Sequence, residues 1–361
     1  MRTPLARHVA GEASAIELRS PFTSAIMQAV GTPKLATALA RDGGLGFLHH
    51  NQPIPDQAAA VREVKTRTAG FERVPNEDPD GVPNQVVDAT GRLRVGAGVN
   101  THDYQERVPV LLEAGVDALC FDSSDGYSDW QARALSWVKK HFPEVPVGGG
   151  NVVDGEAFTF LAEAGADFVK VGVGGGSICI TRDQKGIGRG QASAVLDVAA
   201  ARDAFRERTG EYVPICSDGG LAHDYHVALA LAMGADFVMM GRYFAGFDQA
   251  AGAKLPTRDG FVKEYWGEGS NRARNWQRYG QGGQGLVFEE GVDGYVPYAG
   301  DLHEGLARTV AKLKNTMVSC GSPTLPEFRS TARLTLVSDQ SFQESHANVS
   351  VSPREAPATL S

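Results

Sequence analysis

The chain has 361 residues, and its hydrophobic content of 42% is enough to bury a large core. The formal net charge of −8 disfavours non-specific binding to nucleic acids or anionic membranes, because an acidic protein repels polyanions. No apolar stretch reaches the roughly 18 residues of a membrane span, and none follows Met1 as in a signal peptide, so we expect a cytoplasmic protein.

Short apolar runs alternate with longer segments of helical period, and there are eight such units. The runs begin near Pro21, Leu45, Arg94, Asp117, Pro146, Asp167, Val213 and Asp236. Amphipathic segments such as 32–41 and 190–207 follow them. Eight βα units are typical of a (β/α)8 TIM barrel, which we favour over an open parallel sheet.

A repeated sequence marks three junctions between a helix and the next strand. The repeats are Ala-Gly-Val-Asp at 114–117, Ala-Gly-Ala-Asp at 164–167 and Met-Gly-Ala-Asp at 233–236. Glycine at the second position permits the left-handed end of a helix. Any parallel α/β protein contains such turns, so the repeat supports the fold class more strongly than it supports a closed barrel.

Two segments interrupt the alternation. Residues 74–92, rich in Asn, Asp, Pro and Gly, are typical of a mobile linker. Residues 254–298 follow the eighth strand and combine glycines with aromatic residues and arginines, which predicts a long mobile flap. A last helix near 302–313 precedes a polar tail at 340–361, expected to be an arm or disordered. We interpret 1–361 as a single catalytic barrel domain.

Glycine-rich loops follow three consecutive strands of the predicted barrel, at the end where catalytic groups lie. They are 172–181 after the sixth strand, Asp218-Gly219-Gly220 after the seventh and Gly241-Arg242 after the eighth. Together they predict a phosphate site, because glycine lets backbone N–H groups approach an anion; one such loop alone would suit a flexible turn equally well. Asp218 suits a ribose diol, with helix capping as the alternative.

The four cysteines lie at wide spacings without a CxxC pair, which predicts reduced thiols and no zinc site. Cys120 and Cys216 lie within apolar strands and are expected in the core, and Cys320 lies near the last helix. Cys179 lies in the glycine-rich loop beside the predicted phosphate site, so we predict that it is a nucleophile. The hydroxyl of Thr181 could hold a water molecule or the substrate.

Residues after the third and fourth strands could hold a second ligand. Asp122 suits a ribose or an amide and is followed by Ser123 and Ser124, while His102 and Trp130 offer flat faces for a purine base. The alternative is a capped helix start with Trp130 packed in the core.

The flap carries a basic cluster in an otherwise acidic protein, namely Arg272, Arg274 and Arg278 with Tyr279 beside them. Most arginine clusters are solvated surface. The neighbouring tryptophans suggest instead a segment that closes over an anionic ligand and excludes or meters water.

The sequence resembles the IMP dehydrogenase and GMP reductase family. The segment Gly-Gly-Gly-Ser-Ile-Cys-Ile-Thr at 174–181 looks like its cysteine loop, and Gly-Ile-Gly-Arg-Gly-Gln at 186–191 is similar to the sequence that follows it. The resemblance runs from about residue 18 to 348, broken at the linker. The pair Arg278-Tyr279 resembles the dehydrogenases and is lacking in the reductases, and 289–294 matches the far end of the flap.

The resemblance implies that the Cys179 thiolate attacks C2 of inosine 5′-monophosphate (IMP) while hydride passes to NAD, giving a covalent thioimidate. The flap then enters the vacated site. Arg278 acts there as general base on a water molecule, helped by Tyr279 and Thr181, and hydrolysis releases xanthosine 5′-monophosphate (XMP). An arginine can act as a base only where its surroundings lower the cost of its neutral form.

The resemblance also implies a set of residues for each ligand. Those for IMP are Ser24, Met27, Asn151, Lys170, Gly176, Ser177, Asp218, Gly219, Gly220, Gly241, Arg242, Tyr265, Gly267, Glu268, Gly269 and Glu290. Those for NAD are Asp122, Ser123, Ser124, His102, Trp130, Gly172 and Gly174, with the adenine between His102 and Trp130. Those for K+ are the carbonyl groups of Gly174, Gly176 and Cys179, completed by Glu344, Ser345 and His346 of a neighbouring subunit in a homotetramer.

The sequence departs from the family pattern in three places. The family usually carries a pair of regulatory CBS modules between the second and third barrel units, where only the linker 74–92 stands, so regulation through such modules is expected to be absent. The segment before the first strand is short. Glu344-Ser345-His346 replaces the Glu-Gly-Gly of some relatives, which bears on the use of potassium.

Three alternative functions remain open. A GMP reductase would release ammonia from GMP with NADPH, and Thr181 and Glu290 could serve that chemistry too. A flavin-dependent barrel oxidoreductase would also place phosphate at the seventh and eighth strands but would be coloured. A nucleotide-binding paralogue without turnover would bind IMP and make no NADH.

Overall fold

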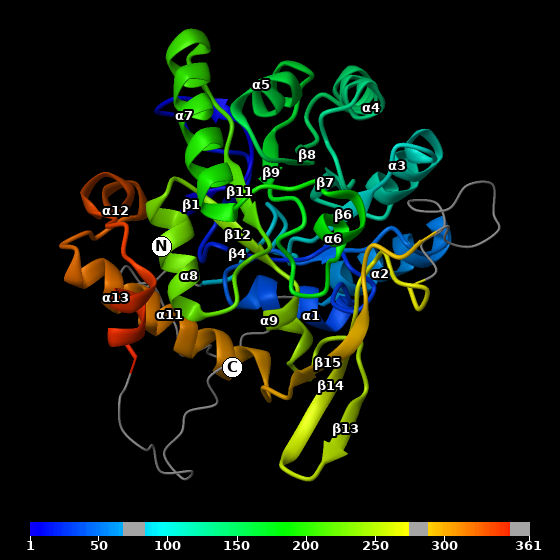
Figure 1. The fold of residues 1–361 in the computed structure, drawn as a ribbon. Helices are drawn as coiled ribbons and strands as arrows, with labels where there is room; N and C mark the ends of the chain where they lie inside the picture. The colour runs from blue at the N-terminus through cyan, green and yellow to red at the C-terminus, as the bar shows by residue number, and fades with distance from the viewer. Residues whose placement is uncertain (68–83, 274–287, 347–361) are drawn as a thin grey trace.

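The computed structural model of the protein describes residues 1–67, 84–273 and 288–346, and its centre is an eight-stranded parallel sheet (Figure 1). The strands are β4 (Phe22–Ser24), β5 (Phe47–Leu48), β6 (Gly96–Val99), β7 (Ala118–Phe121), β8 (Val147–Val152), β9 (Phe168–Val171), β11 (Ile215–Asp218) and β12 (Phe237–Met240). β4 pairs with β12, and a bridge between Thr23 and Leu45 joins the two ends of the sheet. The predicted (β/α)8 barrel is therefore confirmed.

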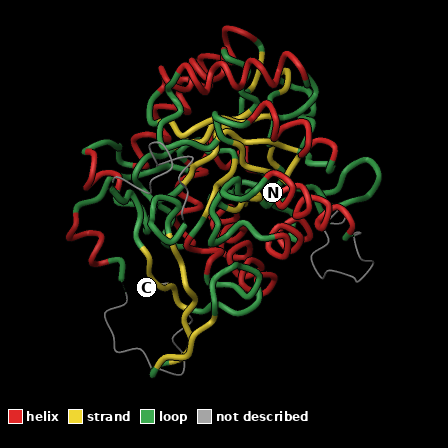
Figure 2. The backbone as a smooth tube through the Cα atoms, turned by 90° about the vertical axis from the view of Figure 1, so that its right-hand side faces the viewer, coloured by secondary structure: helices red, strands yellow, loops and turns green. Residues whose placement is uncertain are grey.

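Helices connect successive strands and surround the sheet (Figures 1 and 2). They are α1 (Pro33–Arg41), α2 (Ile54–Thr66), α3 (Tyr104–Glu113), α4 (Asp129–His141), α5 (Gly155–Glu163), α7 (Gln191–Thr209), α8 (Asp224–Ala232) and α11 (Leu302–Ser319). Thr32, Ser128 and Asp154 each cap a helix by accepting a hydrogen bond from the backbone N–H three residues on. α11 continues past its predicted end at Leu313 because Met317 extends its buried face.

Three phenylalanine rings pack together inside the barrel. The centroids of Phe47 and Phe168 lie 6.1 Å apart, and those of Phe168 and Phe237 lie 5.9 Å apart. A side chain at Gly148 would clash with them, because its Cβ would lie 2.1 Å from the ring of Phe168. The interior is thus filled by alternating large and small residues, as in other packed barrels.

The three repeated helix–strand junctions share one conformation. Gly115, Gly165 and Gly234 have φ angles of 94°, 103° and 117°, in the region that favours glycine. At Gly165 the missing side chain also leaves room for the aliphatic part of Lys139, because a Cβ there would lie 2.9 Å from Cγ of that lysine.

The aspartate that closes each repeat ties a helix to two strands, and we call this arrangement an aspartate clamp. Asp117, Asp167 and Asp236 accept hydrogen bonds of 2.8, 2.7 and 2.9 Å from the backbone N–H at the start of the preceding strand, β6, β8 or β11. Each carboxylate also pairs with a cation of the helix before that strand. The cations are Lys65, Lys139 and Arg202. The clamps lie at the N-terminal end of the barrel strands, where side chains serve stability.

The clamp at Asp236 is the most deeply buried. Its side chain has no exposed surface, and it binds Arg202, Arg329 and the hydroxyl of Tyr212. Burial alone would raise the pKa of Asp236, but the guanidinium groups of Arg329 and Arg202 lower it below its ordinary value. The carboxylate therefore stays charged at neutral pH.

The segment expected to be a flap contains a three-stranded antiparallel sheet that projects from the barrel in both views (Figures 1 and 2). Its strands are β13 (Lys254–Thr257), β14 (Gly260–Trp266) and β15 (Asp293–Pro297), and residues 274–287 lie outside the described part of the chain.

The expected linker is described only in part. Residues 84–92 form a largely exposed turn, closed by a bridge between Val87 and Leu93, while 74–83 lie outside the described residues. The short elements are β1 (Thr3–Pro4), β2 (His8–Val9), β3 (Glu17–Leu18), α6 (Thr181–Lys185), β10 (Glu211–Tyr212), α9 (Arg242–Ala245), α12 (Leu325–Thr331) and α13 (Asp339–Glu344). Within the described ranges, every helix is too short or too polar to cross a membrane.

We expect Asp236→Asn to lower the free energy of unfolding by about 3–5 kcal/mol at pH 7, because it leaves two arginines beside a neutral buried group. Urea unfolding measures the difference. The loss should shrink as pH falls below about 4, the ordinary pKa of aspartate, because the unfolded chain then binds a proton that the folded carboxylate of Asp236 binds only at lower pH. Asp129→Asn is the matched control, since Asp129 is 81% exposed and lies 3.9 Å from Arg133; it should change stability by less than about 1 kcal/mol. Equal effects of the two substitutions would contradict the clamp.

Candidate active site

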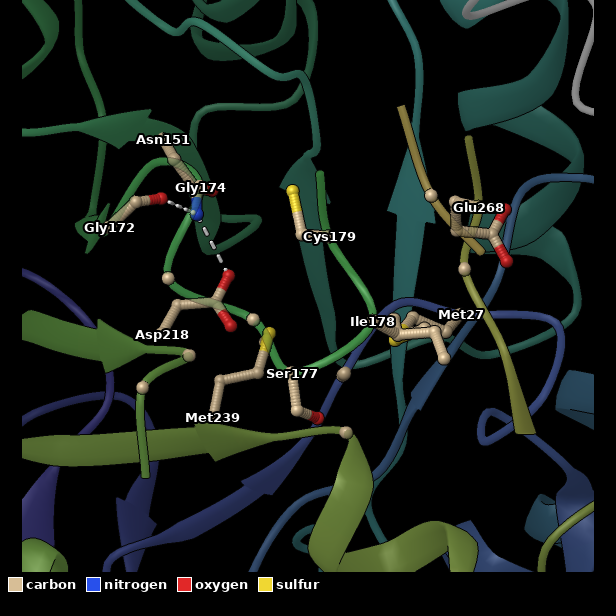
Figure 3. Close-up of a pocket in the computed structure, with 18 of the residues that line it drawn as sticks. Met27, Asn151, Gly172, Gly174, Ser177, Ile178, Cys179, Asp218, Met239 and Glu268 are labelled. Atoms are coloured by element: carbon tan, nitrogen blue, oxygen red, sulfur yellow. Dashed lines mark hydrogen bonds between the residues drawn. The ribbon is translucent and has the colours of Figure 1, made fainter. Parts of the chain in front are cut away.

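A cavity of about 420 Å³ opens at the C-terminal end of the barrel strands and brings together most of the residues that the sequence singled out. Figure 3 shows its wall, with Cys179 between Asn151 and Asp218 on one side and Glu268 on the other. The predicted residues on its lining are Met27, Asp122, Ser123, Ser124, Asn151, Lys170, Gly172, Gly174, Gly176, Ser177, Cys179, Thr181, Asp218, Gly219, Gly220, Gly241, Arg242, Tyr265, Gly267, Glu268, Gly269 and Glu290.

Cys179 is half-buried on the loop between β9 and α6. Its backbone N–H donates to the carbonyl of Gly176 at 3.1 Å. Gly174, with φ of 69°, turns the loop in a conformation that favours glycine. The guanidinium of Arg182 donates to the carbonyl of Val173 at 3.1 Å and ties the loop to the first turn of α6. The thiol is thus accessible from the cavity while the backbone that carries it is held.

A chain of hydrogen bonds leads from the thiol to a carboxylate. Cys179 Sγ lies 3.1 Å from Thr181 Oγ1, which donates to Glu290 Oε2 at 3.0 Å. Because the single hydroxyl proton of Thr181 points to Glu290, the thiol must be the donor in the first contact. Thr181 and Glu290 are 5% and 8% exposed, so the chain is shielded from bulk water. Such an arrangement can carry a proton away from the sulfur.

The other described thiols lie in different surroundings. Cys120 and Cys216 are fully buried in the barrel core, as predicted, and Cys320 is exposed at the end of α11. Burial raises the pKa of Cys120 to about 12 and that of Cys216 well above its ordinary value. Of the four, only Cys179 lies on the wall of the cavity.

Lys170 forms the charged floor of the cavity. It is fully buried on β9, and its Nζ donates to Asp122 at 2.6 Å and to Asp218 at 2.9 Å. Burial alone would lower the pKa of Lys170, but the two carboxylates raise it above its ordinary value, so the ammonium form persists. One cation therefore holds together two carboxylates that the sequence assigned to different ligands.

Asn151 extends this network toward the cysteine loop (Figure 3). Its Nδ2 donates to the carbonyl of Gly172 at 2.6 Å and to Asp218 Oδ2 at 2.9 Å. Its Oδ1 is buried and accepts no hydrogen bond from the described residues. A ligand that donates an N–H or O–H to this oxygen would satisfy it.

The glycine-rich loops contact one another so closely that side chains would not fit. A Cβ at Gly172 would lie 2.2 Å from the carbonyl oxygen of Asp218, and one at Gly241 would lie 2.6 Å from the hydroxyl of Tyr265. Burial raises the pKa of Tyr265, which keeps this hydroxyl protonated. The three glycine-rich loops, Arg242 and Tyr265 all line the same cavity, and backbone N–H groups with a guanidinium suit a phosphate.

The N-terminal base of the expected flap is anchored to the barrel. Arg272 donates to Glu264 at 2.8 and 3.2 Å, and its guanidinium lies 4.1 Å from the ring centroid of Trp266. The indole N–H of Trp266 donates to Gln28 at 3.0 Å, and Asn51 donates to the carbonyl of Ala273 at 2.6 Å.

Several predicted residues lie away from this cavity or outside the described part of the chain. Ser24 is fully buried, and its hydroxyl accepts a hydrogen bond from the backbone N–H of Phe47 at 2.9 Å. His102 is exposed, and Trp130 is 71% exposed, which rules out the alternative that it packs in the core. The predicted catalytic residues Arg278 and Tyr279 lie outside the described residues.

The predicted potassium ligands of the C-terminal arm, Glu344, Ser345 and His346, are exposed at and just after the end of α13, which lies far from α6 in Figure 1. This chain therefore does not bring them to its own cysteine loop.

Sequence reasoning predicted Met27 but missed the rest of the apolar wall. Ile178 and Met239 line the cavity, and Figure 3 draws Met239 below Asp218. Met239 and Met240 immediately precede Gly241, so the rule that strand ends face the site could have identified them. Gly291 also lines the cavity, and no local feature distinguishes it.

Comparisons with known proteins agree with this geometry. A family model described as "IMP dehydrogenase / GMP reductase domain" matches residues 3–348. The chain is similar to the inosine-5′-monophosphate dehydrogenase of Tritrichomonas foetus, with 42% identity over 96% of this chain and 91% of that protein. Proteins of the same name from Aquifex aeolicus and Borreliella burgdorferi are 30% and 32% identical over 95% and 92% of this chain, and 91% and 89% of their own lengths.

The alignment with the Tritrichomonas protein spans 457 positions, so at least 96 of them face no residue of this 361-residue chain. That difference agrees with a short segment in the place of an inserted pair of modules.

We expect iodoacetamide at pH 8 to label Cys179 and Cys320 and to leave Cys120 and Cys216 unmodified, because burial and a raised pKa suppress the thiolate of the latter two. Peptide mass spectrometry resolves the four sites. In denaturant all four should react, which controls for the intrinsic chemistry. Native labelling of Cys216 ahead of Cys179 would contradict the assignment of the accessible thiol.

Proposed function

The chain belongs to the IMP dehydrogenase / GMP reductase family, and from this premise we propose that it oxidises IMP to XMP with NAD+ and water. The observation that carries the proposal is the hydrogen-bonded chain from Cys179 through Thr181 to Glu290 on the wall of the cavity. A thiol with its own proton acceptor, beside a phosphate-binding wall, suits covalent attack on a nucleotide base.

The polar groups of the cavity fit the parts of IMP. The glycine-rich loops and Arg242 would bind the phosphate, and Asp218 would accept hydrogen bonds from the ribose diol. The unsatisfied Oδ1 of Asn151 supplies a further acceptor for a donor group of the nucleotide. These contacts would place the purine base over Cys179.

The proposed chemistry has two steps that share one intermediate. Cys179 Sγ forms a bond to C2, its proton passes through Thr181 to Glu290, and the hydride of C2 leaves with its two electrons. NAD+, when bound, accepts that hydride. In the second step a water oxygen bonds to C2 and the C2–sulfur bond breaks. One proton of the water goes to the sulfur, which restores the thiol, and the other stays on the nucleotide as XMP leaves.

The described residues fit NAD+ on the side of the cavity next to β7. Asp122, Ser123 and Ser124 line it there, and Asp122 accepts a hydrogen bond from the ammonium group of Lys170. Trp130 offers a 71% exposed indole face, a suitable surface for stacking an adenine. His102, exposed on the loop before α3, is the proposed second face.

Activation of water is assigned to residues on both sides of the cysteine. The family resemblance gives Arg278 the part of general base, with Tyr279 and Thr181 as helpers. Thr181 is within hydrogen-bond distance of both Cys179 and Glu290, so it is well placed to orient a water molecule near C2.

Potassium and the oligomer belong to the same proposal. The carbonyl of Gly176 already accepts the N–H of Cys179, but a carbonyl oxygen has a second lone pair that can ligate a cation. Since Glu344, Ser345 and His346 lie away from this loop in their own chain, only a neighbouring subunit could complete a K+ site with them. A homotetramer would supply that neighbour.

We expect the intact protein to form NADH from IMP and NAD+ in the presence of K+, followed by absorbance. Cys179→Ala should form none, and Arg278→Ala should accumulate protein with a covalently bound nucleotide, seen in the intact mass. Ammonia release from GMP with NADPH would instead support a reductase, and binding of IMP without NADH would support a silent paralogue.

We expect Thr181→Val to lower kcat by roughly 10²-fold, because valine keeps the shape of the side chain and removes the hydroxyl between Cys179 and Glu290. Thr181→Ser keeps the hydroxyl and should retain most of the activity. Steady-state kinetics with both variants makes the comparison, and equal kcat values for the two would remove Thr181 from the proton path.

A further inference from the structure

The cysteine loop is paired with the segment that follows the undescribed part of the flap. The N–H of Ile180 donates to the carbonyl of Glu290 at 2.9 Å, and the N–H of Val292 donates to the carbonyl of Ile178 at 3.0 Å. Cys179 and Gly291 form an antiparallel bridge between these two bonds. The loop is therefore not a free turn, because its reactive residue is part of a β-ladder.

The segment 290–292 is paired on its other side as well. The N–H of Gly267 donates to the carbonyl of Val292 at 3.0 Å, and the N–H of Glu290 donates to the carbonyl of Gly269 at 3.0 Å. These bonds continue the ladder of β14 and β15, whose last registered pair is Trp266 with Asp293. Residues 178–180 are thus joined through 290–292 to the sheet that projects from the barrel.

The type of pairing places Gly291 directly against Cys179. The two hydrogen bonds join the residues on either side of the Cys179–Gly291 pair, which makes it a pair without hydrogen bonds of its own. Side chains in such pairs lie closest across a ladder. A residue with a side chain at 291 would therefore lie against the backbone of the cysteine loop.

The backbones at Gly291, Gly267 and Ile178 are closely packed against one another. A Cβ at Gly291 would lie 3.2 Å from Cα of Gly267 and 3.4 Å from the carbonyl oxygen of Ile178. A Cβ at Gly267 would lie 3.1 Å from Cα of Gly291 and 3.2 Å from the same oxygen. A side chain at 267 would press on the carbonyl of Ile178, which immediately precedes Cys179. A side chain at 291 would touch the same carbonyl and press on the backbone of Gly267.

We propose that the strand Glu290–Gly291–Val292 positions Cys179, and that Gly291 and Gly267 are positioning residues which set the direction of its thiol. In Figure 3 the side chain of Ile178 extends toward Met27 whereas that of Cys179 points in another direction, and both residues line the cavity. The inference rests on the proposed function in taking Cys179 as the nucleophile. It adds that this strand sets the orientation of the Cys179 side chain.

The same strand carries the proton acceptor. Glu290 binds Thr181 through its side chain and Ile180 through its carbonyl, so one residue fixes both the register of the loop and the end of the proton path. Lys185 of α6 lies 3.4 Å from the other carboxylate oxygen of Glu290 and reinforces the contact. A shift of this strand would therefore move the thiol and its acceptor together.

Gly291→Ala tests the proposal, with Gly294→Ala as the matched control. Gly294 lies three residues further on in β15, and a Cβ there would meet no atom within 4 Å. Two readouts are needed. Hydrogen exchange of the peptide that covers Ile178–Thr181 measures how firmly its backbone hydrogen bonds hold, without any turnover. The pre-steady-state burst of NADH measures the rate of the step in which the thiol attacks.

For Gly291→Ala we expect exchange in this peptide to be about tenfold faster and the burst about tenfold slower or more, with the affinity for IMP within roughly twofold of the parent. Gly294→Ala should match the parent in all three. If Gly291→Ala does not fold, Gly267→Ala, whose Cβ would lie 3.2 Å from the same carbonyl, should repeat the changes in exchange and burst; its affinity for IMP is not a criterion, because Gly267 is among the residues assigned to IMP.

A folded Gly291→Ala protein with unchanged exchange or an unchanged burst would overturn the proposal. Failure of the proposed function is a separate outcome: the parent protein would then show no burst, while the exchange experiment would still test whether the strand holds the loop.

Discussion

The cavity depends on one buried ammonium group. Lys170 on β9 lies between Asp122 at the end of β7 and Asp218 at the end of β11, and it lets both carboxylates face the same space. Without a cation there, two negative charges would repel each other in surroundings of low dielectric constant. Asn151 carries the network on to Gly172, where the cysteine loop begins. The position of one lysine thus sets the distance between the two halves of the site.

The barrel was predictable because its determinants are local. Apolar runs, helix caps and the three glycine turns each determine a local conformation within a few residues. Eight strand–helix units in succession then leave little choice of fold. The sheet β13–β15 was not predicted, since its middle strand buries a charged residue. Lys263 is 3% exposed and donates to the carbonyls of Phe247 and Ala250 at 2.6 and 2.8 Å, partners that no local pattern reveals.

The site was predictable where chemistry is written in residue types. The residue types of Cys179, Asp218 and the glycine-rich loops indicate a function in the sequence, and all of them line one cavity in the structure. Contacts between distant segments were not predictable. Ser24 is satisfied by the backbone of the next strand, and nothing near Gly291 in the sequence indicates that it faces the cysteine. Both facts follow from tertiary pairing, which a single sequence does not display.

The aspartate clamps bear on how the chain folds. Their ion-paired partners are 52, 28 and 34 residues apart, whereas the hydrogen bond from Thr23 to Val238 that helps to join β4 to β12 links residues 215 apart. Short loops close at a lower entropic cost than long ones, so we expect the three clamps to form before the ring closes. Met27 and Gly241, on either side of that seam, both line the cavity. We therefore expect a partly folded molecule in which the seam is still open to lack a complete pocket for a nucleotide.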